Sequence, residues 1–263
     1  MSELVVQQIY DELYNLESRV RKGDSYPIHK KLVFHDEEGI NDIYGWLAKT
    51  IDFKEGDVVL DAGCGVGYGA CLLAKKYNIQ VQGISLSEKE VEKANRFSKK
   101  LELDNRVSFL KQSFDALNGS KFDKIIAVES IKHAVNLSHT LSVLVDALNK
   151  GGSLYIVEDF YQKQDLVPNA SKFKKDWNLS DVFRMSDYYA VLDSGKTRYI
   201  DLTHYMPSKS SLMVNLKLTL TNFMNAFSST KKTSVNKIFR GGYYLDRLYL
   251  DGLMKYGVLI YTK

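Results

Sequence analysis

The chain has 263 residues, of which 44% are hydrophobic and 26% charged, an ordinary composition for a globular protein with a sizeable core. Its 36 basic and 32 acidic side chains give a net charge of +4, too small an excess to indicate a nucleic-acid-binding protein. The two cysteines suggest neither a disulfide framework nor a zinc site, and no uncharged apolar stretch is long enough to span a membrane. We therefore expect a soluble, cytoplasmic protein.

The first 160 residues show a regular alternation of periodic patterns. Apolar residues at helical spacing predict helices over 3–21 and 39–51, which we expect to form an N-terminal lid (residues 1–55). From residue 56 onward, short apolar runs alternate with amphipathic segments. Strands are expected at 58–61, 81–84, 107–110, 124–128 and 153–157, and helices at 70–77, 87–101 and 137–148. This alternation predicts an α/β fold with right-handed crossovers and a doubly wound, mostly parallel sheet, with the ligand-binding core at 56–160.

The last part of the chain, residues 161–263, is less regular. Two more strands, at 197–202 and 257–261, complete a predicted seven-stranded sheet. Helices are expected at 186–192, 208–227 and 243–254. The helical insertion between the last two strands, at about 205–240, is expected to cover the site as a substrate lid.

The strongest motif is a glycine-rich loop at 58–70, VVLDAGCGVGYGA. Glycine permits tight turns and lets a ligand approach the backbone closely. Residues 65–70 also fit the dinucleotide fingerprint, which leaves a NAD(P)-dependent oxidoreductase open. Such an enzyme needs an acidic residue at the end of the second strand, where this chain has Ser85, whereas Asp61 ends the first strand. An anion beside the loop suits the amino group and sulfonium of S-adenosyl-L-methionine better than a pyrophosphate.

Four segments carry a family resemblance. Residues 61–67 (DAGCGVG) resemble motif I of class I S-adenosylmethionine-dependent methyltransferases. Residues 83–87 (GISLS) resemble a motif of sterol, tocopherol and prenyl-diphosphate C-methyltransferases and of cyclopropane fatty acid synthases. Residues 122–130 (FDKIIAVES) are similar to the fourth-strand signature, and 148–152 (LNKGG) to the L-x-P-G-G turn, with lysine replacing proline. The resemblance implies a Rossmann-like methyltransferase fold and direct in-line methyl transfer from S-adenosyl-L-methionine to carbon, oxygen or nitrogen of a small organic molecule.

The resemblance also implies which residues contact the cofactor. They are Asp61, Gly63, Cys64, Gly65, Ser85, Leu86, Ser113, Phe114 and Glu129. Asp61 and the glycines would hold the methionine half, Ser85 the ribose, and Leu86 the adenine. Ser113 and Phe114 stand where relatives have an acidic adenine ligand, and Asp115 is the alternative if the register shifts. Ser87 with Glu90 three residues later fits a helix capping box.

Glu129 and His133 are the candidate catalytic residues. In prenyl-diphosphate C-methyltransferases the glutamate that matches Glu129 is understood to stabilise a carbocation or remove a proton, and burial would raise its pKa toward that of a useful base. A cap or a contact to the bound cofactor is the alternative role. His133 would suit O- or N-methylation as a base, or is a packed histidine. Glu158 and Asp159 follow the fifth strand and are expected on the substrate side; they do not match the Asp-Asn pair of a catechol-type metal site, so no metal is expected.

Two other functions compete with small-molecule methylation. A nucleic-acid methyltransferase would carry an Asn/Asp-Pro-Pro-Tyr/Phe motif or a Pro-Cys pair, and neither occurs in this sequence, so no nucleic-acid partner is expected. A non-catalytic S-adenosylmethionine-binding module would not need the lid segments. The identity of the acceptor and the existence of a homodimer stay open at this stage.

Overall fold

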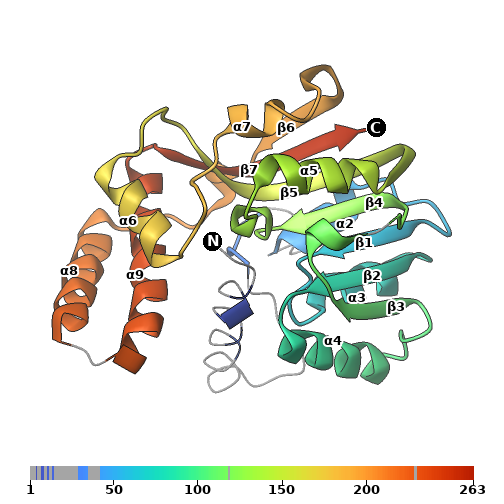
Figure 1. The fold of residues 1–263 in the computed structure, drawn as a ribbon, viewed down its shortest axis with the longest axis horizontal. Helices are drawn as coiled ribbons and strands as arrows, with labels where there is room; N and C mark the ends of the chain where they lie inside the picture. Colours follow the sequence, from blue (N-terminus) through green and yellow to red (C-terminus); the bar gives the residue numbers. More distant parts are fainter. Residues whose placement is uncertain are drawn as a thin grey trace.

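The computed structural model describes residues 4, 7, 8, 11, 14, 29–34, 42–117, 119–227 and 230–263, with backbone only for 226–227 and 230–235. The helix predicted over 3–21 and the first residues of the one predicted over 39–51 lie largely outside this part. The described elements form one seven-stranded sheet with helices on both faces, and a helical group stands at one end of the sheet (Figure 1). Among the described helices, none combines the length and hydropathy that crossing a bilayer requires.

The order of the strands confirms the predicted doubly wound, mostly parallel sheet. The strands are β1 (Val58–Ala62), β2 (Gln80–Ser85), β3 (Val107–Lys111), β4 (Phe122–Val128), β5 (Leu148–Tyr161), β6 (Thr197–Asp201) and β7 (Met254–Thr262). They pair in the order β3-β2-β1-β4-β5-β7-β6, and only β7 runs antiparallel to its neighbours. The direction of winding reverses between β1 and β4, so a ligand is expected at the carboxyl ends of these strands.

The helices divide between the two faces of the sheet. They are α2 (Ile43–Thr50), α3 (Tyr68–Lys76), α4 (Glu88–Lys100), α5 (Leu137–Asp146), α6 (Pro168–Asp176), α7 (Met185–Tyr189), α8 (Ser211–Phe227) and α9 (Thr230–Leu250). Helices α2, α3 and α4 share a core with Val59 of β1, whereas α5 and α7 share one with Leu60. Because successive strand residues point to opposite faces, a strand covered on both sides has to be apolar throughout, as the sequence pattern indicated.

The second half departs from the prediction in three places. Helix α6 was not predicted, because three of its nine residues are lysine and its apolar stripe is short. Helix α9 begins at Thr230, well before the predicted start at residue 243, since its first two turns are polar. It ends before residue 254, where β7 begins, so the predicted helix over 243–254 is wrong at both ends. Strand β5 is also longer than predicted, and Tyr161 at its end packs with α6 and α9.

Candidate active site

A cavity opens at the carboxyl ends of β1 to β4, where the strand order places a ligand site. Eight of the nine predicted cofactor residues line it, as does His133. The exception is Asp61, which is fully buried and not part of the cavity wall. Three further wall residues come from distant parts of the chain: His29, Trp177 and Ile238 of α9.

The glycine loop is held against the neighbouring strands. The backbone amides of Gly63 and Cys64 both donate to the carbonyl of Ile84, each at 3.0 Å. Gly63 has a φ of 92°, and a Cβ there would lie 2.4 Å from the Cβ of Ser130, so no other residue fits. Gly65 has a φ of 51°, but a Cβ there would meet no atom within 4 Å. The loop is therefore packed tightly on one side and open at Gly65, toward the cavity.

Asp61 is a buried carboxylate with unused hydrogen-bonding capacity. The hydroxyl of Tyr44 donates to one of its oxygens at 2.8 Å, while the other oxygen has no hydrogen-bond partner among the described residues. Burial raises the pKa of Asp61 to about 7, although the Tyr44 hydrogen bond lowers it. Such a group gains most from a nearby cation, which would favour its ionised form. This feature, with the open space at Gly65, fits the methionine half of S-adenosylmethionine.

A carboxylate also lies at the end of β2, although the sequence there shows only Ser85. The Ser85 hydroxyl donates to the Glu90 carboxylate at 2.6 Å, and both side chains line the cavity. Glu90 is almost fully buried, and its backbone amide donates to the Ser87 hydroxyl at 3.4 Å, as a capping box predicts. Its side chain, however, is paired with Ser85 rather than with the Ser87 amide. The sequence argument that Ser85 leaves this place without an acid is therefore wrong, because α4 supplies one.

The segment after β3, where the adenine contacts were predicted, lies at the cavity. Ser113 caps a short 3₁₀ turn, accepting from the amide of Asp115 at 3.2 Å. Phe114 and Asp115 both line the cavity, and the Asp115 carboxylate accepts from the Thr140 hydroxyl at 2.8 Å. Both residues considered as adenine ligands, Ser113 and Asp115, are thus in reach of the cavity.

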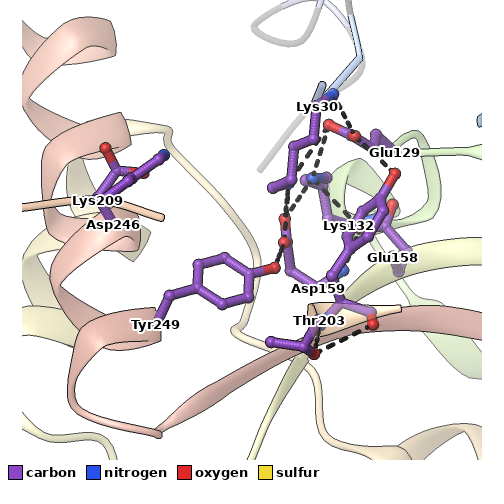
Figure 2. Close-up of polar contacts among 10 residues, drawn as sticks. Lys30, Glu129, Lys132, Glu158, Asp159, Thr203, Lys209, Asp246 and Tyr249 are labelled. Carbon is purple, nitrogen blue, oxygen red and sulfur yellow. Dashed lines mark hydrogen bonds and ion pairs between the residues drawn. The ribbon is translucent and has the colours of Figure 1, made fainter. Parts of the chain in front are cut away.

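On the other side of the cavity, a buried cluster of charges joins three distant segments (Figure 2). Lys30 lies 2.8 Å from an Asp159 oxygen and 3.4 Å from Glu129. Lys132 lies 2.7 Å from Asp159 and 3.3 Å from Glu158. Three acids thus face two lysines. Burial, together with the neighbouring acids, raises the pKa of Glu158 to about 7 despite Lys132, so the cluster is close to neutral overall.

Glu129 is held by several hydrogen-bond donors. Its carboxylate accepts from the Lys30 backbone amide and from the Tyr256 hydroxyl, each at 2.9 Å. Its φ of 51° is an uncommon, left-handed value, and Glu129 directly follows the last residue of β4. Burial alone would raise the pKa of Glu129, but Lys30 and Lys132 lower it to about 2. The expectation that its pKa is raised is therefore wrong: Glu129 is a fixed anion.

His133 and the acids after β5 also differ from expectation. Burial and the nearby Lys132 lower the pKa of His133 to about 3, so its imidazole is neutral near pH 7. Glu158 and Asp159 are not part of the cavity wall. They instead orient the lysines, and Asp159 also accepts from the Tyr249 hydroxyl.

Several residues of the site had no signal in the sequence. Lys30, Lys132, Trp177 and Ile238 belong to no motif, and they reach the site only through tertiary contacts. The Trp177 indole donates to the Ile238 carbonyl at 2.9 Å, which fixes this part of the wall to α9. Lys132 lies 5.5 Å from the centre of the Trp177 ring, a cation–π contact that connects the wall to the charge cluster.

Fold and site together define the class of protein. A Rossmann dinucleotide-binding sheet has the order 3-2-1-4-5-6, whereas here an antiparallel β7 is inserted between β5 and β6, and a glycine loop with a buried acid stands at the switch point. This is the architecture of class I methyltransferases, whose cofactor is S-adenosylmethionine. The model of the family described as "Methyltransferase domain" matches residues 53–207, and the chain belongs to this family.

Individual relatives are small-molecule methyltransferases, and one of them is a sterol C-methyltransferase, a group that the motifs resembled. The chain is 34% identical over 144 residues to a 27-O-demethylrifamycin SV methyltransferase of Amycolatopsis mediterranei, covering 53% of this chain and 50% of that protein. It is 30% identical over 143 residues to a sterol 24-C-methyltransferase of Saccharomyces cerevisiae, covering 54% of this chain and 35% of that protein. The chain thus matches half or less of the length of these relatives.

A solved structure matches over nearly the whole chain. A geranyl diphosphate methyltransferase in complex with geranyl diphosphate and sinefungin superposes with a TM-score of 0.74 at 15% identity, covering 99% of this chain and 98% of that one. The predicted fold and the predicted methyltransferase class are confirmed. The individual roles of Glu129, His133 and the cofactor residues stay predictions.

Proposed function

We propose that the protein transfers the methyl group of S-adenosylmethionine to a small, largely apolar organic molecule. The observation that carries this proposal is the cavity itself. One half of its wall is a glycine loop with polar groups, and the other half is an apolar surface that includes Trp177 and borders Glu129, Lys132 and His133. The cofactor would supply an activated methyl group on a cationic sulfur. The residues of this chain then have to bind it, orient the acceptor and exclude water.

The cofactor half would be held by the loops after β1, β2 and β3. Asp61 and the glycine loop would hold the methionine part, with Asp61 acting from behind the wall. The Ser85–Glu90 pair would accept hydrogen bonds from the ribose hydroxyls, a charge-assisted contact that a lone serine could not give. Phe114 and Leu86 offer apolar surfaces for the adenine, while Ser113 or Asp115 would accept from its amino group.

The acceptor would lie on the side of Val128, Ala134, Val135, Trp177 and Ile238. These side chains form an apolar wall that suits a molecule of low polarity. The relatives named above act on a rifamycin and on sterols, and the neighbouring structure holds geranyl diphosphate. Sterols and the geranyl group have extended hydrocarbon frameworks, which supports an acceptor with a largely apolar part here.

Glu129 and His133 would provide the fixed charge and the polar contact at this wall. An ionised Glu129 stabilises positive charge on the methyl donor or on an acceptor carbocation, through electrostatic preorganisation rather than proton transfer. A neutral His133 can accept a hydrogen bond from an acceptor hydroxyl or amine and orient its lone pair. With a pKa of about 3, it is too weak a base to remove a proton before transfer.

Calorimetry with S-adenosylhomocysteine, followed by an acceptor screen with methyl-labelled S-adenosylmethionine, tests the proposal. We expect micromolar binding of the demethylated product, no binding of NAD(P), and label transfer to isoprenoid, polyketide or aromatic acceptors. Binding of NAD(P) alone would overturn the proposal. Binding of the cofactor without transfer to any acceptor would favour a non-catalytic module, and label found in nucleic acid would favour the nucleic-acid alternative.

A further inference from the structure

The outer face of α8 is apolar and exposed. Helix α8 lies at the outer edge of the molecule, packed against α9 on its inner side (Figure 1). Six large apolar side chains on it are between 49% and 77% exposed: Leu212, Met213, Leu216, Leu220, Phe223 and Met224. The spacing of Leu212, Leu216 and Leu220 places them along one stripe of the helix. Phe239 of α9 is also half exposed.

The inner side of α8 already has its partners. Val214 is buried, and Leu218 packs against the core formed by α6, α9 and the end of β5. The helix is therefore apolar on both sides, a composition typical of helices that are covered all round. Exposed apolar patches of this kind mark a surface that interacts with another molecule or with a membrane.

The net charge of residues 209–250 indicates the sign of the partner's charge. Residues 209–250 contain seven lysines and arginines but a single acidic residue, and α8 itself contains no acid. Lys209, Arg240 and Arg247 each pair with an aspartate, at positions 246, 176 and 251. Four further lysines follow in this region, at positions 217, 231, 232 and 237. The rest of the chain has 29 basic and 31 acidic residues, so the basic excess of the protein is concentrated at α8 and α9.

An exposed apolar stripe with a basic excess distinguishes between two partners, a second copy of the chain and a membrane surface. A second copy of the chain, packed face to face, would bring two basic surfaces together, which like-charge repulsion disfavours. An anionic bilayer surface accepts leucine and phenylalanine side chains at the boundary of the acyl chains and attracts a region with an excess of lysine. We infer that α8 docks the protein on anionic phospholipid membranes, lying in the plane of the interface.

Docking here would bring the cavity close to the bilayer. Helix α9 carries Lys237 and the exposed Phe239 beside Ile238, which lines the cavity. An apolar acceptor dissolved in the membrane would thus have a short way to the apolar wall. This consequence rests on the proposed function, whereas membrane binding itself does not.

Vesicle flotation tests the docking. The probes are vesicles of equal parts phosphatidylglycerol and phosphatidylcholine, compared with phosphatidylcholine alone. The full chain is expected to float with the anionic vesicles, less so at high salt. The double variant Leu216→Gln/Phe223→Gln should bind at least about tenfold more weakly, because two inserted apolar side chains are lost. Leu110→Gln is the matched control, since Leu110 is a similarly exposed leucine (46%) on β3, at the opposite end of the molecule (Figure 1).

Three outcomes would overturn the inference. One is absence of binding to the anionic vesicles, and another is equal loss of binding in the Leu110 variant. The third is a dimer in light scattering that the double variant converts to monomer, which would make α8 an interface between copies. Binding of S-adenosylhomocysteine is measured on the same samples: if it persists while flotation fails, only the docking is wrong.

Discussion

The two halves of the cavity are built in different ways. The half that we propose binds the cofactor, the cofactor half, comes from loops after β1, β2 and β3, and its wall residues there lie within residues 63–115. The other half is the proposed acceptor half. The acceptor half depends on contacts between residues far apart in the sequence: Lys30 and Asp159 are 129 positions apart, and Glu129 and Tyr256 are 127. A local motif can therefore specify the first half, whereas only the complete fold assembles the second. The two halves should respond differently to substitution.

The largest effect is expected in the cofactor half, from Gly65→Val. The backbone of Gly65 is in the left-handed region, and a side chain there would enter the open space of the cavity. We expect at least about a 100-fold loss of affinity for S-adenosylhomocysteine in calorimetry, since the backbone could no longer approach the ligand.

Gly56→Val is the matched control for the backbone strain. Gly56 also has a positive φ, of 82°, and a Cβ there would meet no atom within 4 Å, but it lies in the turn before β1. The two variants should lose similar thermal stability, while only Gly65→Val loses the ligand. If both bound S-adenosylhomocysteine normally, the glycine loop would not be the cofactor site.

In the acceptor half, Glu129→Gln should reduce turnover about 50-fold while affinity for S-adenosylhomocysteine changes little. The amide keeps the shape and still accepts from Tyr256, but the fixed negative charge is lost. Tyr256→Phe, which removes a single hydrogen bond to Glu129, should have a smaller effect in the same direction. Unchanged turnover in Glu129→Gln would remove Glu129 from the mechanism.

The pH profile of the wild type sharpens this test. Because Lys30 and Lys132 lower the pKa of Glu129 to about 2, it stays ionised down to acidic pH. Its pairing stabilises the folded state above the ordinary glutamate pKa, and this stability is lost as the pH falls toward 2. Turnover should therefore show no inflection due to Glu129 between pH 5 and 8. An inflection there that Glu129→Gln abolishes would restore its role as a base.

The sequence predicted the cofactor half well because the relevant signals are local. The glycine loop, the seven strands and the eight predicted cofactor residues that line the wall followed from segments of fewer than fifteen residues. The acceptor half was predicted poorly for the same reason. Nothing near Lys30 in the chain indicates that it faces Glu129, and the low pKa of Glu129 arises from two lysines outside its strand. Likewise, α9 was placed too late because its first turns are polar and its burial depends on α6.

Glu90 is an intermediate case, since the capping box located its helix position but not its side-chain partner. If the Ser85–Glu90 pair holds the ribose, Glu90→Gln should weaken S-adenosylhomocysteine binding about tenfold, the loss of one charge-assisted hydrogen bond. Glu92→Gln is the control on the same helix, because Glu92 is exposed and forms a 3.8 Å ion pair with Arg96. Equal affinities in the two variants would show that Glu90 only holds the Ser85 hydroxyl and does not contact the ligand.

The smallest effect should come from Asp61→Asn in the protein without ligand, as a change in pH dependence. Burial raises the pKa of Asp61 to about 7, above its ordinary value of 3.8. The folded state therefore keeps this proton where the unfolded chain has released it, so stability falls as the pH rises from about 4 to 7. The asparagine variant should lose this pH dependence. Between pH 5 and 8, its melting temperature should therefore fall by about a few degrees less than that of the wild type. Glu158, whose pKa is also raised to about 7, contributes to the pH dependence of stability in both proteins.

Adding S-adenosylmethionine should flatten the curve of wild-type melting temperature against pH toward that of the variant, since a cation beside Asp61 favours its ionised form. Identical curves for the two proteins would mean that Asp61 is ionised in the free protein and has no need of a cationic ligand.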